Sequence, residues 1–266
     1  MENKILIGPA GSGGGDVGNF EAIKKLGLDA VELEFVHSIW LSKEQALKIR
    51  ESNKNLNLKL SIHAPYYINL NSEDKSKITA SRERILKTME FANLLSNGEK
   101  MPVIFHAGFY MKKTKEETYN IIKEEILRII EESDKRGLKN ALACPETTGK
   151  PSQFGDIDEL LKLMKETQCG ICIDFAHILA RNNGKINYDE IMNKIKNLDP
   201  EKITAHFSGI NFGEKGEKNH ILTEDKEIKE LFHYLNRHNI SITIINESPD
   251  PLGDAIKMKK IWEKEK

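Results

Sequence analysis

The chain has 266 residues, 39% of them hydrophobic and 30% charged, a composition typical of a soluble globular protein. Its three cysteines argue against a disulfide framework, and no apolar run approaches the roughly 20 residues that cross a bilayer. The net charge of −1 neither supports nor excludes a nucleic-acid ligand, because such binding needs a basic face and not a basic total.

Short apolar runs alternate with longer amphipathic segments along the chain. The runs are short and rich in β-branched residues, so we predict eight strands, at 5–8, 30–34, 58–63, 103–106, 141–146, 170–174, 203–207 and 241–247. The segments between and after them have helical periodicity and are predicted as helices, at 19–26, 42–52, 74–95, 114–136, 156–167, 188–196, 223–238 and 254–264. Several begin at a capping residue, and Ser42-Lys-Glu-Gln45 has the pattern of a capping box.

Eight strand–helix repeats can form a closed barrel or an open doubly wound sheet. The regular spacing and the lack of a linker favour a single (β/α)8 TIM barrel that spans residues 1–266 as one domain. The longest stretches without periodicity are 64–72, 175–187 and 208–222, and each follows a strand. We therefore predict them as the loops of the active-site face.

Six consecutive predicted strands carry, at or near their ends, a side chain that can bind a metal ion. These are His63, His106, Glu146, Asp174, His206 and Glu247, and two further histidines, His177 and His220, follow in the loops. One such residue alone is more often structural, but together they would repel one another or be desolvated without a counter-charge. We therefore predict divalent cations, and imidazole with carboxylate suits zinc, manganese or iron. The excess of ligands over four indicates two or more ions.

The motifs around these residues resemble, in order and over nearly the whole chain, those of the endonuclease IV family. They are SIHAPYYINL at 61–70, FHAGF at 105–109, PETT at 145–148, IDFAH at 173–177, HFSG at 206–209 and NESP at 246–249. That family contains zinc-dependent apurinic/apyrimidinic (AP) endonucleases with a TIM-barrel fold. The wider superfamily also holds sugar isomerases and epimerases, so the fold alone does not choose the reaction.

The resemblance implies hydrolysis of the phosphodiester 5′ to an abasic site in duplex DNA, which gives a 3′-hydroxyl and a 5′-deoxyribose phosphate. It implies that Glu146 is catalytic and orients or deprotonates the attacking water. It assigns the predicted ligands to zinc sites: His63 and His106 to the first, Asp174, His206 and Glu247 to the second, Glu146 to both, and His177 with His220 to a third.

One departure from the family concerns the third site. Well-known members carry an aspartate two residues before the last loop histidine, and this chain has Lys218 there. A protonated lysine cannot coordinate zinc, so we expect two zinc sites and a third that is weak or partly occupied, with Mn²⁺ as another possible metal. Glu217 or Glu214 could substitute as ligands, or Lys218 could place its charge against a DNA phosphate.

A second departure concerns DNA contacts. Tyr66 and Tyr67 occupy the place from which the family inserts side chains into DNA, although they could equally line the barrel mouth. The loop after the second strand, 36–41, lacks the family's arginine, and its Trp40 or His37 could stack on DNA, whereas Trp40 could equally pack against a helix.

The alternative function is that of a metal-dependent sugar or sugar-phosphate isomerase or epimerase. It would use Glu146 and Glu247 as a carboxylate pair around one metal ion. Glu32 and Glu34, two apart on a strand, share a face, and acidity near the barrel would repel a phosphodiester unless metals neutralise it. That is a point in favour of a sugar substrate.

For two further motifs a structural interpretation is favoured over a functional one. The glycine-rich segment 11–15 could cradle a phosphate, although a flexible loop is the favoured interpretation. Cys169 and Cys172 match C-x-x-C, but they run into a strand, where residues three apart point to opposite faces. With no recognisable signal peptide, we expect a cytoplasmic monomer that has no membrane segment and no obligate protein partner. Its expected partner is duplex DNA containing abasic sites.

Overall fold

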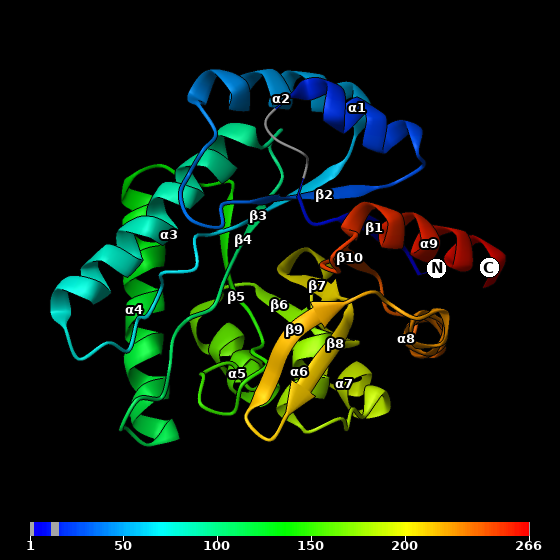
Figure 1. Cartoon of the computed structure of the whole chain (residues 1–266). Helices are drawn as coiled ribbons and strands as arrows, with labels where there is room; N and C mark the ends of the chain where they lie inside the picture. The colour runs from blue at the N-terminus through cyan, green and yellow to red at the C-terminus, as the bar shows by residue number, and fades with distance from the viewer. Residues whose placement is uncertain (1–2, 12–15, 266) are drawn as a thin grey trace.

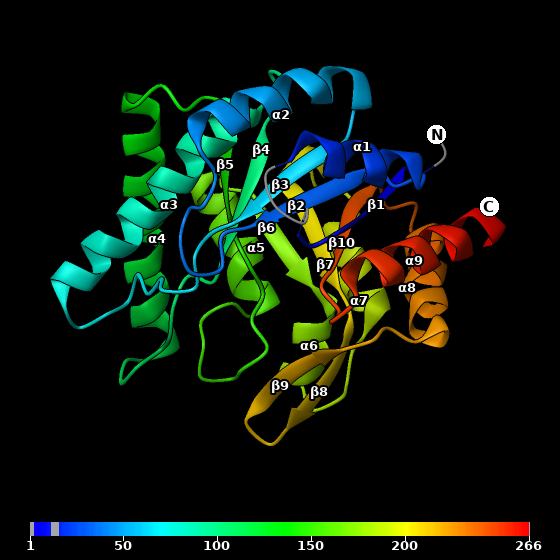
Figure 2. The same cartoon turned by 45° about the horizontal axis from the view of Figure 1, so that its top comes forward.

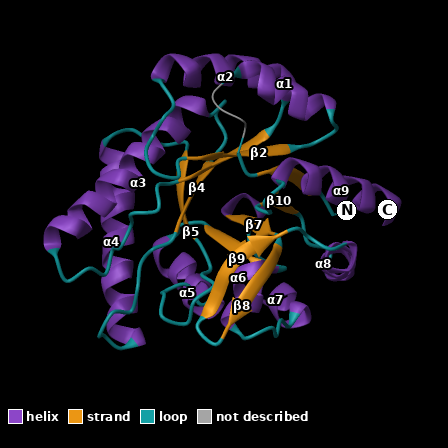
Figure 3. Cartoon of the chain, viewed as in Figure 1, coloured by secondary structure: helices purple, strands orange, loops and turns teal. Residues whose placement is uncertain are grey.

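The computed structural model describes residues 3–11 and 16–265, and in this part of the chain strands and helices alternate (Figures 1 and 3). The barrel strands are β1 (Ile5–Pro9), β2 (Ala30–Glu34), β3 (Lys59–His63), β4 (Met101–Phe105), β5 (Ala141–Pro145), β6 (Ile171–Asp174), β7 (Ile203–Phe207) and β10 (Ile242–Asn246). The helices expected from the sequence are α1 (Val17–Lys25), α2 (Lys43–Leu56), α3 (Lys75–Leu95), α4 (Lys115–Lys135), α5 (Ile157–Thr167), α7 (Tyr188–Ile195), α8 (Asp225–Arg237) and α9 (Pro251–Glu265). Every predicted strand and helix is confirmed, with small differences at the ends.

The strands form a closed ring. Hydrogen bonds join them into two parallel four-stranded sheets, in the orders β1-β10-β7-β6 and β2-β3-β4-β5. A parallel bridge closes each gap between the sheets: Ala10 pairs with Glu32 after β1, and Glu146 pairs with Cys172 after β5. At the first gap, Gly11 N also donates to Glu32 O at 2.9 Å. The predicted (β/α)8 TIM barrel is therefore confirmed.

The hydrophobic core has two layers. The larger layer lies between the strands and the surrounding helices, and a smaller cluster fills the barrel interior with Ile104, Leu142, Cys144 and Cys172. Cys169 belongs to the outer layer and Cys172 to the inner cluster, as expected for residues three apart on a strand. The three cysteines, all in the described ranges, are free thiols and buried. The motif runs into β6 as predicted: Cys169 precedes the strand and Cys172 lies in it.

Local signals fixed several helix starts. At α2, Gln45 N donates to Ser42 Oγ at 3.2 Å and Ser42 N donates to the Gln45 side chain at 3.0 Å, which confirms the capping box. Of the helices that the structure describes, none is long and apolar enough to cross a membrane. The proposed phosphate cradle at 11–15 lies outside the described residues apart from Gly11.

Two predicted loops were wrong, because they contain regular structure. The stretch after β6 begins with a short helix, α6 (Phe175–Arg181), which is too short to show a helical period in the sequence. The stretch after β7 forms an antiparallel hairpin of β8 (Gly209–Gly213) and β9 (Gly216–Ile221), whose alternation is broken by an irregularity in register. Figure 2 shows this hairpin projecting from one end of the barrel beside α6.

Candidate metal centre

All eight predicted ligands lie at the end of the barrel where the parallel strands finish. The alternation of side chains along each strand explains their common direction. Cys144 and Cys172 belong to the interior cluster, and Glu146 and Asp174 stand two residues further along the same strands. They therefore occupy the last inward position of each strand. The same spacing relates Ile104 to His106 after β4.

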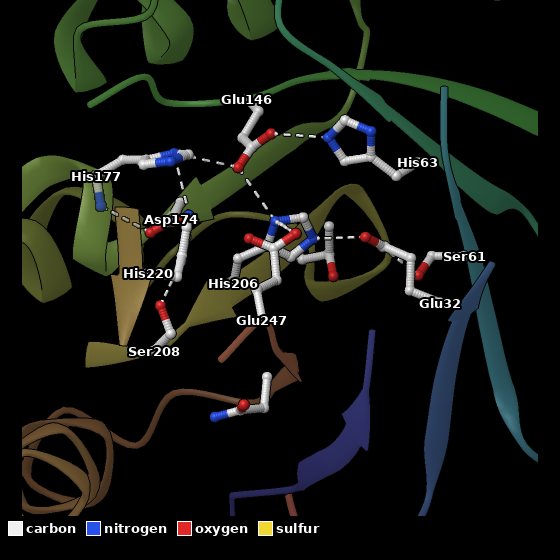
Figure 4. Close-up of polar contacts among 12 residues, drawn as sticks. Glu32, Ser61, His63, Glu146, Asp174, His177, His206, Ser208, His220 and Glu247 are labelled. Carbon is white, nitrogen blue, oxygen red and sulfur yellow. Dashed lines mark hydrogen bonds and ion pairs between the residues drawn. The ribbon is translucent and has the colours of Figure 1, made fainter. Parts of the chain in front are cut away.

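Glu146 is the centre of the cluster, and its carboxylate is almost fully buried. Its Oε2 lies 3.3 Å from His63 Nε2 and 2.9 Å from His106 Nε2. Its Oε1 lies 3.1 Å from His206 Nδ1 and 3.4 Å from His177 Nδ1 (Figure 4). One carboxylate thus faces separate imidazoles with each oxygen, which is the arrangement needed to bridge two cations.

The structure brings together two of the ligand sets expected from the sequence. Candidate ligand atoms of His63, His106 and Glu146 lie within 4.8 Å of one another. The same limit holds for a second set, made of Glu146, Asp174, His206 and Glu247. In that set His206 Nδ1 is 3.2 Å from Glu247 Oε1. Both sets combine imidazole with carboxylate, the donors that suit zinc or manganese.

The other nitrogen of the His206 ring, Nε2, contacts an acidic residue from across the barrel. His206 Nε2 lies 2.9 Å from Glu32 Oε1, and Ser61 Oγ donates to Glu32 Oε2 at 2.6 Å (Figure 4). A carboxylate on the far nitrogen of a ligand histidine fixes its ring and makes it a better donor. Glu32 and Glu34 were predicted to share a face of their strand, and both do lie inside, but the contact of Glu32 with His206 was not predicted.

Three buried carboxylate oxygens have no hydrogen-bond partner in the described part of the chain: Glu32 Oε1, Glu34 Oε1 and Asp174 Oδ2. Burial raises the pKa of Asp174 above its ordinary value and raises that of Glu34 well above it. Leaving a buried acceptor unsatisfied costs about 1–3 kcal/mol. A cation between these carboxylates and the histidines would remove that cost, so the residues present fit bound metal ions.

The charges in the cluster are strongly coupled. Burial alone would lower the pKa of His63 and of His177, but neighbouring carboxylates, Glu146 foremost for His63 and Asp174 for His177, raise both to about 10. Burial alone would raise the pKa of Glu146, yet the charges of His106 and other histidines hold it well below its usual range. Without a metal, the cluster is therefore a network of charged imidazoles and carboxylates.

The third expected pair, His177 and His220, also comes together. Asp174, which the sequence analysis assigned to the second ion alone, offers an atom within 4.8 Å of both histidines. Of the two substitutes considered for the missing aspartate, Glu217 lies near the pair, with its Oε2 3.5 Å from His177 Nε2, whereas Glu214 lies in the turn between β8 and β9.

The cluster lines a cavity of about 400 Å³ at the mouth of the barrel. Tyr66 and Gln153 contribute to its wall, and so does Lys150 from the loop after β5. Lys150 is the one lysine or arginine among the described residues that line the cavity. Its backbone is held in place, because Lys150 O accepts a hydrogen bond from Arg181 at 2.7 Å. Lys150 was not predicted from the sequence, since nothing in its spacing marks it.

A second groove adjoins the cavity at the edge of the barrel mouth. We name its two exposed tyrosines, Tyr66 and Tyr67, the aromatic rim. Tyr66 lines both, and Tyr67, Phe109 and Arg84 line the groove, whose volume is about 560 Å³. Tyr66 and Tyr67 are 57% and 62% exposed, so both aromatic faces are accessible next to the metal-binding residues. Lys218 is exposed on the hairpin and does not line the cavity.

Trp40 is engaged in packing. Its indole nitrogen donates to Glu34 O at 2.7 Å, and its ring meets Phe35 edge-on at 5.7 Å between centroids. Trp40 therefore packs against Phe35 and not against a helix, and 41% of it remains exposed. His37, from the same loop, lies 6.4 Å from the Tyr67 ring, at the edge of the aromatic rim.

Comparisons with known proteins agree with the barrel and with the motifs. The family described as xylose isomerase-like TIM barrel matches residues 20–265. An uncharacterized protein of Methanocaldococcus jannaschii is 39% identical over 98% of both chains. A probable endonuclease 4 of Aster yellows witches'-broom phytoplasma is 29% identical over 59% of this chain and 56% of its own length.

Solved structures share the whole fold at low identity. Endonuclease IV from Thermus thermophilus covers 100% of both chains at 21% identity, with a TM-score of 0.70. A D-tagatose 3-epimerase-like protein covers 98% of this chain and 96% of its own at 20% identity, with a TM-score of 0.72. At these identities both likenesses show the fold alone, which proteins named for nuclease and for sugar chemistry share.

Proposed function

This chain belongs to the xylose isomerase-like TIM barrel family, and from that premise we propose that it is a metal-dependent AP endonuclease. The reaction would be hydrolysis of the phosphodiester 5′ to an abasic site in duplex DNA, leaving a 3′-hydroxyl and a 5′-deoxyribose phosphate. Zinc is the proposed metal, and manganese is the alternative that the same donors suit.

The observation that carries this proposal is the two-sided environment of Glu146. Its Oε2 faces His63 and His106, and its Oε1 faces His206 and His177. A single metal ion would leave the imidazoles on one of the two carboxylate oxygens without a metal to bind. Two ions that share a carboxylate are the arrangement used to cleave phosphoesters.

The residues divide the work of the reaction. Bound divalent ions would stabilise the phosphoryl oxygens and lower the pKa of the attacking water. Glu146 would orient or deprotonate that water, because its carboxylate lies at the centre of the cluster. Lys150 would place a positive charge against the phosphate from the cavity wall.

The rim supports a polymeric substrate. A free sugar would be enclosed by the 400 Å³ cavity, whereas the exposed Tyr66 and Tyr67 lie beyond it along a second groove. Aromatic faces of this kind stack on unpaired bases. We propose that the two tyrosines contact the DNA beside the abasic site and that Lys218, exposed on the hairpin, contacts a phosphate.

The direct test is incision of a labelled duplex that carries one abasic analogue. Metal-free protein reloaded with Zn²⁺ or Mn²⁺ is expected to cut on the 5′ side of the lesion and to leave an intact duplex of the same sequence uncut. A chelator should stop the reaction, and Glu146→Gln should slow it by roughly a hundredfold or more. The absence of chelator-sensitive cutting with either metal would refute the proposal.

The second candidate is a sugar isomerase or epimerase that uses one ion. The set of Glu146, Asp174, His206 and Glu247 alone satisfies four ligand positions, and the epimerase-like fold match favours it. This candidate gives His63 and His106 no role in metal binding or in the reaction. This candidate gains if the protein binds one ion per chain, interconverts ketoses, and binds no DNA.

A further inference from the structure

One carboxyl group in the cavity wall has no role in the proposed metal sites. Glu34 is the last residue of β2, and it lines the cavity. Its Oε1 is buried and has no hydrogen-bond partner in the described part of the chain. A carboxyl oxygen needs a donor in such a place, because it has left water without gaining a partner. A bound ligand is the remaining source of that donor.

Among the described side chains that line the cavity, two have a buried oxygen without a hydrogen-bond partner: Glu34 and Gln153. They come from different parts of the ring, since β3 and β4 separate β2 from β5. Gln153 belongs to the loop after β5, which also carries Lys150 to the cavity wall. That loop is the side proposed for the phosphate, and the amide nitrogen of a glutamine can itself donate to a phosphate oxygen. Glu34 has no such donor and lies elsewhere.

Glu34 stands between the metal-binding residues and the aromatic rim. It is in register with His63 on the neighbouring strand β3. Two residues after Glu34, Val36 O accepts a hydrogen bond from Tyr66 N at 3.2 Å. His63 is a candidate ligand of the first ion, and Tyr66 begins the rim. A substrate that reaches from the ions to the rim therefore passes Glu34.

A metal ion is the other partner that this carboxylate could take. Glu34 offers an oxygen within 4.8 Å of oxygens of Glu32 and Glu247. Both of these neighbours already contact His206, since Glu32 Oε1 lies 2.9 Å from its Nε2 and Glu247 Oε1 lies 3.2 Å from its Nδ1. The two ligand sets that share Glu146 with His63 or Asp174 do not include Glu34. Ions bound in those sets would leave the Glu34 carboxyl group to the substrate.

The proposed substrate has a hydrogen-bond donor that fits this position. A phosphodiester presents oxygen acceptors only, so it has no donor for a carboxyl group. A nucleotide that has lost its base has also lost the amino and ring N–H groups of that base. What it gains is a hydroxyl on C1 of the deoxyribose, at the point where the base was attached. This hydroxyl distinguishes an abasic site from every intact nucleotide.

We propose that Glu34 is a specificity-determining residue that accepts a hydrogen bond from the C1 hydroxyl of the abasic deoxyribose. The inference rests on the proposed endonuclease function and names the feature of the substrate that the site selects. It also makes the acidity of β2 compatible with a phosphodiester, because Glu34 faces the sugar while the metal ions and Lys150 face the phosphate.

Two duplexes that differ by a single hydroxyl test the proposal. One carries an abasic site made by removal of uracil, and the other carries a tetrahydrofuran analogue, which has the same ring without the C1 hydroxyl. The ratio of kcat/KM for the two duplexes is measured with metal-loaded protein. The wild type is expected to prefer the abasic site by roughly 10- to 100-fold. Glu34→Met, which removes the acceptors and keeps the length of the side chain, should bring the ratio close to one.

Two further variants serve as controls. Glu34→Gln keeps one acceptor oxygen and should retain part of the preference. Gln153→Met makes the matched change at the other cavity residue with an unpartnered oxygen, and it should keep the wild-type ratio even if both rates fall. Each ratio is taken within one preparation, so a partly unfolded fraction cancels.

Several outcomes would overturn the inference. They are a wild type that cuts both duplexes equally, a Glu34→Met variant with the wild-type ratio, and loss of the preference in Gln153→Met instead. Loss of a bound ion from Glu34→Met, counted by mass spectrometry, would assign the residue to a metal site. If the wild type cuts neither duplex, the proposed function fails and this inference falls with it, whereas equal cutting of both refutes this inference alone.

Discussion

His206 shows how single residues prepare this cluster for metal ions. Its Nδ1 faces Glu146 and Glu247, while its Nε2 meets Glu32 at 2.9 Å. In the described part of the chain neither Glu32 Oε1 nor His206 Nε2 has a hydrogen-bond partner by geometry, so their close approach is an ion-pair contact. Glu32 is in turn held by the hydroxyl of Ser61.

We predict that Glu32→Gln weakens zinc binding at the His206 site by roughly 10- to 100-fold, because a neutral amide no longer makes the imidazole a stronger donor. A competitive zinc titration against a chromogenic chelator measures the change. Ser61→Ala, which keeps the carboxylate and removes only its hydrogen-bond donor, should have a smaller effect. Equal zinc affinity for Glu32→Gln and the wild type would show that Glu32 is not a positioning residue.

Among the secondary-structure elements, the loop after β3 and helix α3 build the accessible aromatic rim. Arg84 of α3 donates to Tyr67 O at 2.9 Å and so holds the loop against the helix. Tyr66 also meets the His63 ring at 5.8 Å between centroids, whereas Tyr67 stands further from the ligands, against His37. A substitution of Tyr67 should therefore disturb metal binding less than one of Tyr66, so Tyr67 is the better residue at which to test DNA contact alone.

We predict that Tyr67→Ala lowers the affinity for duplex DNA with an abasic site by roughly five- to a hundredfold, as expected if one stacked base loses about 1–3 kcal/mol. Fluorescence anisotropy with the metal-loaded protein measures it. Metal content should not change. Leu127→Ala, which removes an exposed apolar side chain on α4, is the control. If both variants bind like the wild type, the rim does not stack on DNA.

The stability of the whole molecule and its affinity for metal ions both depend on the charges of the side chains inside the barrel. In the metal-free protein His63 and His177 have pKa values of about 10, above the ordinary 6.5. Groups with a raised pKa stabilise the fold fully below pH 6.5, and this stabilisation is lost as the pH rises through 10. Metal binding has the opposite dependence, because the ions displace protons from the same imidazoles.

We predict that the urea midpoint of metal-free protein falls between pH 6.5 and 10, while zinc affinity rises over the same range by roughly tenfold per pH unit for each proton released. Urea unfolding with a chelator and zinc titrations at matched ionic strength measure the two trends. The variant His63→Gln should weaken both trends, because His177 still titrates over the same range. A metal-free midpoint that does not change with pH would contradict the charged state assigned to the two histidines.

Much of the fold and the candidate site was predictable from the sequence, because the relevant signals are local. A run such as Ile171–Asp174 shows its strand by its own composition, and period two places Asp174 on the same side as Cys172. The parallel topology then gathers the strand ends at one face. In this way the barrel, its strands and the positions of the eight candidate ligands followed from residues read in order.

The tertiary structure decided what depends on register between distant segments. The contact of Glu32 with His206 crosses the barrel, and the closure between β1 and β2 passes Gly8, where a Cβ would stand 1.9 Å from Ala30 O. Glu217, next to the irregularity in the hairpin register, lines the cavity, although the family resemblance pointed to position 218. Hydrophobic period is encoded within each segment, whereas such contacts depend on how segments far apart in the chain are aligned.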